Sequence, residues 1–491
     1  MLFDSIPFVI FFVSVFILYF TLPAAWQKWL LLLASCYFYM AFIPQYILVL
    51  FFLITIDYIL GLRIERSVGK TRMLYLVFGI ATNIGTLFFF KYFNFFNQNV
   101  ATLADFLHWN YSLESLAIIL PIGLSFHTFQ SLAYIFEVYK GRFAAERNYV
   151  TYALYVMFFP QLVAGPIERP EHLLPQLRNT HTFNYDSAVS GLQLLLWGFF
   201  KKIVIANNLA ILVDFVYGHL DTANGSMVLL AVFSFAIVLY ADFSGYSDIA
   251  VGSARMLGIE LAQNFRQPYF AESIAELWRR WHISLSLWFR DYVYYPLVWS
   301  GKGRGAAWVY LSIITTFLLT GVWHGAGLNF IIMGLIFGLL ICLEVWTRSL
   351  REKILGFFPI KLDAFYTRSI NIVITFVLAS FSWVFFRAND LTQAITIIKK
   401  VFLDWGPGAF SYLTCTNYCA FYEIGIGKTT LAMIGVSVTI LFAYELFTEL
   451  RLALPAWWYR RTLRWSLYYA FIIWILFAGN FVPKTFIYFQ F

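Results

Sequence analysis

Long apolar stretches alternate with short polar segments along nearly the whole chain. A helix needs roughly 20 apolar residues to cross a bilayer, and fewer where flanking Trp and Tyr residues reach the interface. The apolar runs are residues 8–22, 29–42, 46–62, 74–90, 115–136, 188–217, 228–249, 309–322, 330–345, 370–386, 431–447 and 467–482. This pattern predicts an all-α polytopic membrane protein with about ten to twelve transmembrane or re-entrant helices.

The composition agrees with a membrane protein. Of the 491 residues, 61% are hydrophobic and 12% are charged, whereas a soluble domain carries about 25% charged residues. The first apolar run has no basic segment before it and no small-residue cleavage site, so it predicts a span and not a removed signal peptide. Because no internal repeat or polar linker interrupts the chain, we expect one membrane domain over residues 1–491.

The net charge of +8 indicates orientation and not nucleic-acid binding, because the basic residues lie in short loops beside the apolar runs. Loops rich in Lys and Arg stay in the cytoplasm. The basic clusters lie at residues 63–72, 140–147, 279–304, 348–361 and 451–464. The loops around residues 94–114, 218–226 and 404–423 are then outside. Cys415 and Cys419 share one of these outer loops, where a disulfide and two free thiols are both open alternatives.

Two basic clusters, 279–304 and 348–361, fall on the cytoplasmic side in succession, so the segment between them must enter the membrane and return. Its two apolar runs are separated by "TGVWHGAG", which predicts a hairpin or re-entrant unit. Irregular backbone at membrane depth is tolerated only where protein buries it or where it lines a cavity. This segment therefore indicates a pocket.

The stretch "LWRRWHISLSLWFRDYVYYP", residues 277–296, combines basic and aromatic residues. If it is one helix ended by Pro296, one face is aromatic and apolar and the opposite face is polar. The first face carries Trp278, Trp281, Leu285, Trp288, Phe289 and Tyr292, and the second carries Arg279, His282, Ser286 and Arg290. One interpretation is an interfacial helix with arginines on lipid phosphate. Another is a helix at the mouth of a cavity that binds an anionic ligand. Both can hold.

His324 lies in "LLTGVWHGAGLNF", with no charged residue between Arg304 and Glu344. Burial disfavours the charged form of an imidazole at such a position. Glycines at 321, 325 and 327 allow a helix or a substrate to approach closely. Two interpretations remain open: a histidine that hydrogen-bonds between helices, and a neutral general base near a substrate hydroxyl.

Other polar residues carry weaker signals. No two histidines have the spacing of a metal site, so we expect no metal. In "YADFSGYSDIA", Asp242 and Asp248 lie near membrane depth, where a carboxylate is paired for structural support or handles a ligand or proton.

Two segments, "WRRWHISLSLWFRDYVYYPL" and "GVWHGAGLNF", resemble the signature segments of the membrane-bound O-acyltransferase family. The bacterial alginate O-acetylase (AlgI-type) branch is the most similar. The likeness extends along most of the chain, through "PIGLSFHTFQSLAYIFEVYKG", "MFFPQLVAGPIERPEHLLPQL", "YADFSGYSDIAVG", "SWVFFRA" and the terminal "IYFQF".

The resemblance implies helices arranged in a ring around a central tunnel, with His324 as the catalytic histidine and His282 as the second motif histidine. It implies no bound cofactor and an acyl donor from the cytoplasm, either acetyl-CoA or a charged carrier protein. It further implies a bacterial inner-membrane enzyme that works with a periplasmic acetyl-accepting protein of the SGNH or esterase-like kind and with exopolysaccharide machinery, as for alginate.

Roles for individual residues follow from this chemistry. Donor phosphates attract arginines, so Arg279, Arg280 and Arg290 are candidates for donor binding. Trp281 and Ser286 lie beside them in the sequence and are candidates as well.

At the reacting centre, His324 is expected to take the proton of an attacking hydroxyl. Asn329, or backbone N–H groups freed by the glycines, would stabilise the oxyanion. We expect His282 to orient the donor or to carry a second proton, and not to be the base, because its amphipathic segment predicts a wetter setting.

Three other functions compete with O-acetyl transfer. A D-alanyl transferase for teichoic acids, fed by a carrier protein, belongs to the same branch, but the chain length and the "FIYFQF" ending favour the alginate type. A small-solute transporter would use the histidines as proton relays, but the usual repeats and paired broken helices are missing from the sequence. A scaffold without chemistry of its own is the third alternative.

Overall fold

The structure is a computed structural model that describes residues 1–111, 113–114, 116, 120–356, 365–405, 427–452, 461–482 and 486–487. Within these ranges all regular secondary structure is helical, so the predicted all-α fold is confirmed. Cys415 and Cys419 lie outside the described residues.

The chain folds into two compact units that do not follow the sequence in a simple order. The first consists of Met1–Leu195 and Ser247–Gln263, and the second of Leu196–Tyr246 and Asn264–Gln490. The chain passes from one unit to the other at residues 195–196 and again at 246–247, and both positions lie within helices and not in polar linkers. The single membrane domain over residues 1–491 stays a prediction.

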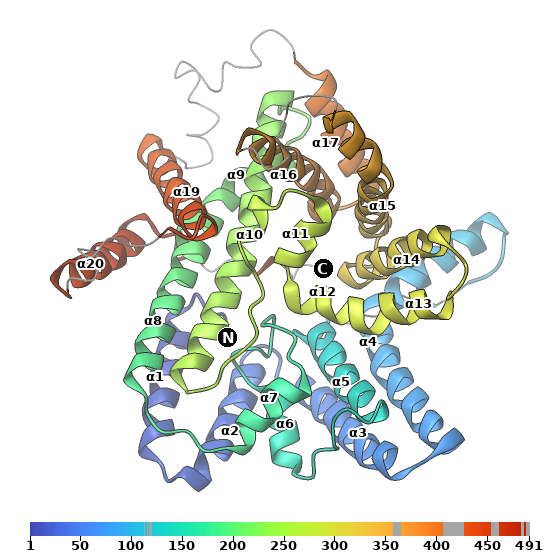
Figure 1. The fold of residues 1–491 in the computed structure, drawn as a ribbon, viewed down its shortest axis with the longest axis vertical. Helices are drawn as coiled ribbons and strands as arrows, with labels where there is room; N and C mark the ends of the chain where they lie inside the picture. Colours follow the sequence, from blue (N-terminus) through green and yellow to red (C-terminus); the bar gives the residue numbers. More distant parts are fainter. Residues whose placement is uncertain are drawn as a thin grey trace. The chain divides into compact units, whose positions relative to one another are not determined.

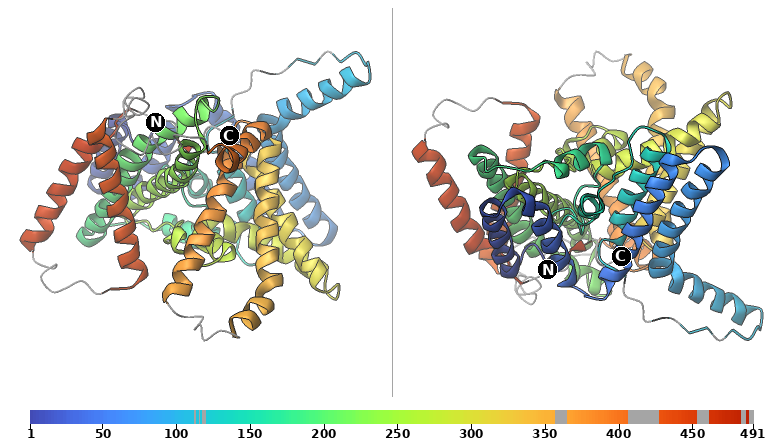
Figure 2. Two further views of the ribbon diagram at one scale, coloured as in Figure 1. Left: turned by 90° about the horizontal axis from the view of Figure 1, so that it is seen from above. Right: turned by 90° about the horizontal axis from the view of Figure 1, so that it is seen from below.

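The first unit contains the N-terminal helices of the chain (Figure 1). They are α1 (Ile6–Thr21), α2 (Gln27–Met40), α3 (Tyr46–Arg66), α4 (Gly69–Phe106), α5 (Leu124–Tyr139), α6 (Tyr149–Met157), α7 (Pro170–Arg178) and most of α8 (Tyr185–Phe199), with a short 3₁₀ turn, η1 (Ala24–Trp26). Helices α3, α4 and α5 pack against one another. Figure 2 shows α4 as a long helix whose light-blue end extends away from α3 and α5.

The second unit contains both histidine motifs. Its elements are η2 (Phe200–Ala206), α9 (Asn207–Gly218), most of α10 (Gly225–Met256), η3 (Pro268–Phe270), α11 (Ile274–Arg280), α12 (Ile283–Phe289), η4 (Arg290–Tyr294), α13 (Tyr295–Ser300), α14 (Ala306–His324), α15 (Leu328–Gly356), α16 (Phe365–Arg387), α17 (Leu391–Leu403), α19 (Lys428–Glu449) and α20 (Arg461–Ala478). Of these, η2 and η4 are π-helical and η3 is a 3₁₀ turn.

Seven helices in the described part of the chain are long and apolar enough to cross a membrane: α3, α4, α10, α14, α15, α16 and α19. Two shorter apolar helices, Ile6–Thr21 and Thr462–Ala478, add to them. The apolar run 188–217 is not one regular helix, because the π-helical turn η2 separates α8 from α9. These helices confirm a multi-pass membrane protein.

The segment 277–296 is not the single helix that its periodicity predicts. The first helix, α11, begins with a capping interaction in which Ser273 accepts a hydrogen bond from the N–H of Glu276 (3.1 Å). The chain then turns sharply at His282, which has left-handed backbone angles (φ 42°, ψ 54°), and α12 begins after it. Pro296 lies in the first turn of α13 and does not end a helix, because the first helical turn needs no N–H donor there.

The hairpin predicted from "TGVWHGAG" is confirmed: α14 ends at His324, α15 begins at Leu328, and the two helices pack against each other along their length. In the views of Figures 1 and 2 they are the yellow and gold helices. The 19 residues of α14 rise about 28 Å at 1.5 Å per residue. Both helices are therefore long enough to span, and the depth of His324 in the membrane stays a prediction.

Candidate functional site

His282 caps the start of α12 and is completely buried, with 0% of its surface exposed. Its Nδ1 lies 3.1 Å from Oδ1 of Asn264. The edge of its ring meets Phe243 of α10, with ring centroids 4.7 Å apart and an interplanar angle of 86°. The imidazole is thus held from one side by a hydrogen bond and from another by an aromatic ring.

Burial lowers the pKa of His282 to about 3, because a charged imidazole loses its hydration in this setting. His282 is therefore neutral near pH 7. The prediction that His282 sits in a wetter place than His324 is wrong, since His324 is the more exposed of the two, at 4%. A single interfacial helix over residues 277–296 would place His282 near water, but the turn at residue 282 directs this side chain into the protein.

His324 is the last residue of α14 and is also buried. Its ring packs against its neighbour Trp323 (4.7 Å between centroids) and against Phe386 near the end of α16 (5.3 Å, 84°). The hairpin turn that follows supplies little bulk of its own, because it contains Gly325 and Gly327.

Trp323 connects the two motif histidines. Its ring lies 4.7 Å from that of His324 and 6.1 Å from that of His282. Both histidines therefore belong to one buried aromatic cluster, although 41 residues (283–323) lie between them in the sequence. The sequence predicted the two histidines but gave no evidence that Trp323 lies between them.

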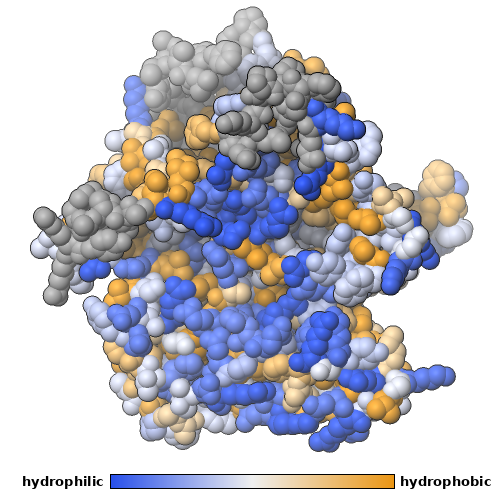
Figure 3. Space-filling model, viewed as in Figure 1, coloured by the Kyte–Doolittle hydropathy of each residue, from blue (hydrophilic) through white to orange (hydrophobic). Residues whose placement is uncertain are grey.

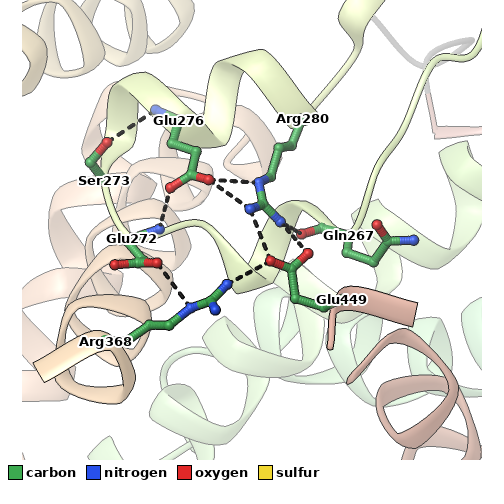
Figure 4. A network of polar contacts seen from close by, with 7 residues as sticks. All are labelled: Gln267, Glu272, Ser273, Glu276, Arg280, Arg368 and Glu449. Carbon is green, nitrogen blue, oxygen red and sulfur yellow. Dashed lines mark hydrogen bonds and ion pairs between the residues drawn. The ribbon is translucent and has the colours of Figure 1, made fainter. Parts of the chain in front are cut away.

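Arg280 does not offer its guanidinium to a ligand in this structure. Its five N–H groups make five hydrogen bonds: Nε and Nη2 donate to Oε1 of Glu276 (3.0 and 2.6 Å), Nη1 and Nη2 to the carboxylate of Glu449 (2.7 and 3.1 Å), and Nη1 to the carbonyl of Gln267 (3.4 Å). Figure 4 shows the guanidinium held between the two carboxylates. The predicted role of Arg280 in donor binding does not fit this arrangement.

The same network joins three helices. Arg368 of α16 donates to Oε1 of Glu449 in α19 (2.7 Å) and pairs with Glu272 (2.9 Å) just before α11 (Figure 4). The network therefore fastens the start of the histidine-bearing segment to α16 and α19.

The other two predicted arginines are exposed. The side chain of Arg279 is exposed and makes no hydrogen bond or ion pair with any residue in the described part of the chain. Arg290 bonds to its neighbour Asp291 (2.8 Å) and lies over the ring of Tyr295. Hydrophilic residues gather over the region of α11 in Figure 3. Of the three arginines, Arg279 has the most freedom to bind an anion.

Ser286, Trp281 and Asn329 have structural contacts. The hydroxyl of Ser286 donates to the carbonyl of Trp281 (3.2 Å), and the ring of Trp281 is buried against Trp383 (5.1 Å). Asn329 donates both amide hydrogens to carbonyls at the end of α16, those of Phe385 (3.1 Å) and Ala388 (2.9 Å). Because both donors are used, the amide of Asn329 is not placed as an oxyanion donor here.

The contacts of Asp242 fit a carboxylate that is paired for structural support. Its Oδ1 pairs with Nζ of Lys202 (2.5 Å), and its Oδ2 accepts the N–H of Ile487 (3.0 Å). All of these groups are buried. The carboxylate thus joins α10, the π-helical turn η2 and the C-terminal segment.

Asn264 and the partners of Arg280 are functional-site residues that the sequence did not predict. The "SIAE" of residues 273–276 is a capping-box pattern and signalled a helix start at Ile274. No local pattern signalled Asn264, whose contacts to the segment after α11 are made only in the folded chain.

The sequence profile of the MBOAT, membrane-bound O-acyltransferase, family matches residues 145–387. This range includes His282, His324, Trp323 and Asn264. The chain belongs to the membrane-bound O-acyltransferase family and is an O-acyltransferase. The transporter and scaffold interpretations are therefore set aside.

The chain is also similar to individual proteins with named activities. The chain is 37% identical over 446 residues to a protein named probable alginate O-acetylase AlgI from Azotobacter vinelandii, covering 89% of this chain and 84% of the relative. It is 34% identical over 432 residues to a peptidoglycan O-acetyltransferase from Helicobacter pylori, covering 81% and 79%. A teichoic acid D-alanyltransferase from Bacillus subtilis is 29% identical over 244 residues, covering 46% and 60%.

Proposed function

We propose that the protein transfers an acetyl group from acetyl-CoA, entering from the cytoplasm, to an acceptor on the outer side of a bacterial inner membrane. The observation that carries this proposal is the enclosure of both motif histidines in one buried aromatic cluster. Support for acetyl as the group comes from the relatives named O-acetylases and O-acetyltransferases, which match over most of the chain.

In the proposed reaction an acceptor hydroxyl attacks the thioester carbonyl. Its O–H bond breaks and the proton passes to the imidazole of His324, while the C–S bond breaks and the CoA sulfur leaves. The acceptor oxygen forms the new C–O bond of the ester, and the leaving thiolate takes the proton from the imidazolium of His324, which returns the base to its neutral form. General-base catalysis of this kind contributes about 10²–10⁴-fold, and alignment of the two substrates supplies much of the rest. The surrounding rings of Trp323 and Phe386 exclude water that would hydrolyse the thioester.

The donor is bound in this proposal through its phosphates. Arg279 is exposed and without an ion-pair partner among the described residues, so its full charge is available to an anion. Arg290 is exposed nearby in the sequence but already shares its charge with Asp291. Arg279 is the residue on which donor binding depends most.

The acceptor in this proposal is a periplasmic protein of the SGNH or esterase-like kind, or directly an exopolysaccharide such as alginate. The names of the relatives include alginate and peptidoglycan as modified polymers. Both offer sugar hydroxyls, and a serine hydroxyl on a partner protein has the same chemistry. Transfer to any of them forms an ester from the thioester.

The test is transfer of labelled acetyl from acetyl-CoA in membranes that contain the protein, with the partner and polymer fractions added separately. His324→Ala is expected to lower transfer by at least about 10²-fold while the protein remains folded in detergent. His219→Ala is the matched control, because His219 is exposed and its Nδ1 contacts only the carbonyl of Phe215 (2.9 Å). Unchanged transfer in His324→Ala would remove His324 from the mechanism.

D-alanyl transfer is the second candidate, supported by the similarity to the teichoic acid enzyme over about half of this chain. The same membranes are therefore supplied with a D-alanyl-loaded carrier protein in place of acetyl-CoA. Label that arrives only from the carrier would replace acetyl transfer by D-alanyl transfer.

A further inference from the structure

Asn264 lies in the non-helical segment between α10 and η3 and is buried, with 2% of its surface exposed. Its Oδ1 meets three groups of the segment that follows α11: Nδ1 of His282 (3.1 Å), the backbone N–H of Ser284 (3.3 Å) and the hydroxyl of Ser284 (2.9 Å). One amide oxygen thus organises the turn that carries the second motif histidine.

These contacts determine which atom of the Asn264 amide faces His282. The backbone N–H of Ser284 can only donate, so the atom it meets must be the carbonyl oxygen and not the NH₂ group. A carbonyl oxygen can only accept. The Nδ1 of His282, which shares this oxygen, must therefore carry the hydrogen.

The backbone supports the same arrangement. The N–H of Ile283 donates to the carbonyl of Asn264 (2.9 Å), and the N–H of Arg266 donates to the carbonyl of Arg280 (2.9 Å). These two bonds pair the segment before α11 with the segment after it. They hold His282 in its left-handed conformation (φ 42°), which a residue with a side chain adopts only at a cost in free energy.

We propose that Asn264 is a positioning residue that fixes the imidazole of His282 as the Nδ1–H tautomer, so that toward a substrate its Nε2 can act only as a hydrogen-bond acceptor. This inference rests on the proposed function only for the identity of the substrate. The group that Nε2 would receive is an O–H of the acceptor or an amide N–H of the donor. His282 in this state cannot donate a hydrogen bond from Nε2 to an oxyanion.

The tautomer is measured directly by ¹⁵N magnetic resonance of histidine-labelled protein in lipid, with His282→Gln used to assign the signal of residue 282. The wild type is expected to show a protonated Nδ1 and an unprotonated Nε2. Asn264→Leu is expected to lose this preference. Ser284→Ala is the matched control, because it removes one donor to the same oxygen and leaves the bond to His282 in place.

Asn264→Asp separates positioning from simple structural support, because it keeps an accepting oxygen and adds a negative charge. We expect it to retain more acyl transfer than Asn264→Leu at high pH. Its activity should fall at a pH about 1–3 units higher than that of the wild type, since a nearby carboxylate favours the imidazolium, which has no acceptor at Nε2. The same pH profile in Asn264→Asp and in the wild type would show that the protonation state of His282, which Asn264 contacts, does not limit acyl transfer, and would count against the positioning role.

A protonated Nε2 at residue 282 in the wild type would overturn the inference, and so would an unchanged tautomer in Asn264→Leu. If Asn264→Leu does not fold, the wild-type spectrum and the Asn264→Asp pH profile decide it. The expected spectrum together with no acetyl transfer would refute the proposed function and leave the tautomer assignment standing.

Discussion

Gly321 of α14 and Gly334 of α15 face each other without side chains between them. A Cβ placed on Gly321 would lie 3.3 Å from the Cα of Gly334 and only 2.3 Å from the carbonyl oxygen of Phe330. A Cβ on Gly334 would lie 2.3 Å from the carbonyl oxygen of Phe317. The two helices of the hairpin therefore touch through their backbones, three residues before His324, as small residues allow in membrane helices.

Gly321→Ala is expected to force α14 and α15 apart, because the atoms that a Cβ would meet belong to backbone and cannot rotate away. The free energy of unfolding should fall by about 1–3 kcal/mol, as for overpacked cores, and acyl transfer should fall because His324 moves with the end of α14. Thermal unfolding in detergent and the acetyl-transfer assay measure the two effects.

Gly435→Ala in α19 is the matched control, because a Cβ there would meet no atom within 4 Å. It should leave transfer unchanged and stabilise the helix by up to about 1 kcal/mol. Equal losses in the two variants would show that the close approach at Gly321 is not the cause.

Substitutions of the neighbouring Arg280 and Arg279 are expected to have different effects, the first on stability and the second on donor binding. Arg280→Met removes the cation that Glu276 and Glu449 share. Its stability should fall by an amount at or below the roughly 3–5 kcal/mol measured when one member of a buried pair is removed. Arg368 moderates this loss because it also pairs with Glu449. The unfolding temperature of the purified protein is the measurement.

Arg279→Met is the companion variant, with the same change one residue earlier. Because Arg279 has no ion-pair partner among the described residues, its stability should match that of the wild type. Losing one charge-assisted contact of roughly 1.5–3 kcal/mol to a donor phosphate should raise the KM for acetyl-CoA by about tenfold or more. A normal KM for Arg279→Met would exclude this residue from donor binding.

Much of the fold could be predicted from the sequence because a membrane helix is encoded by a local run of apolar residues. Seven of the twelve apolar runs correspond to helices that are long and apolar enough to span, and two more correspond to shorter apolar helices. The glycine-rich "TGVWHGAG" between two such runs predicted the hairpin that ends α14 at His324. The two histidines were predicted because each is an isolated imidazole in a distinctive motif. These features depend on neighbours within a few residues.

The geometry around His282 could not be predicted in the same way. The periodicity of residues 277–296 indicates one continuous helix, but Asn264, 18 residues before His282, stabilises a turn at His282. Similarly, Arg280 looked available for phosphate because its partner Glu449 lies 169 residues further along the chain. A distant hydrogen bond of this kind overrides local periodicity, and no local pattern reports it.

The stability of the protein is expected to fall between neutral pH and pH 5 through His282. A histidine in the unfolded chain has a pKa of about 6.5, whereas burial lowers the pKa of His282 to about 3 in the folded protein. Below pH 6.5 the unfolded state therefore binds a proton that the folded state does not bind, and the unfolded state is favoured as the pH falls. The loss amounts to about 2 kcal/mol at pH 5 relative to pH 7.5, at about 1.4 kcal/mol per pH unit below 6.5.

His282→Gln removes this titration and keeps a neutral polar side chain. The difference in free energy of unfolding between wild type and His282→Gln is expected to stay constant above pH 7.5. It should change by about 2 kcal/mol in favour of the variant at pH 5. Thermal or chemical unfolding of both proteins in the same detergent at pH 5, 6 and 7.5 measures it. If the free energies of unfolding of the two proteins change in parallel across this range, His282 gains a proton in the folded protein. The description of His282 as a buried, neutral imidazole would then be wrong.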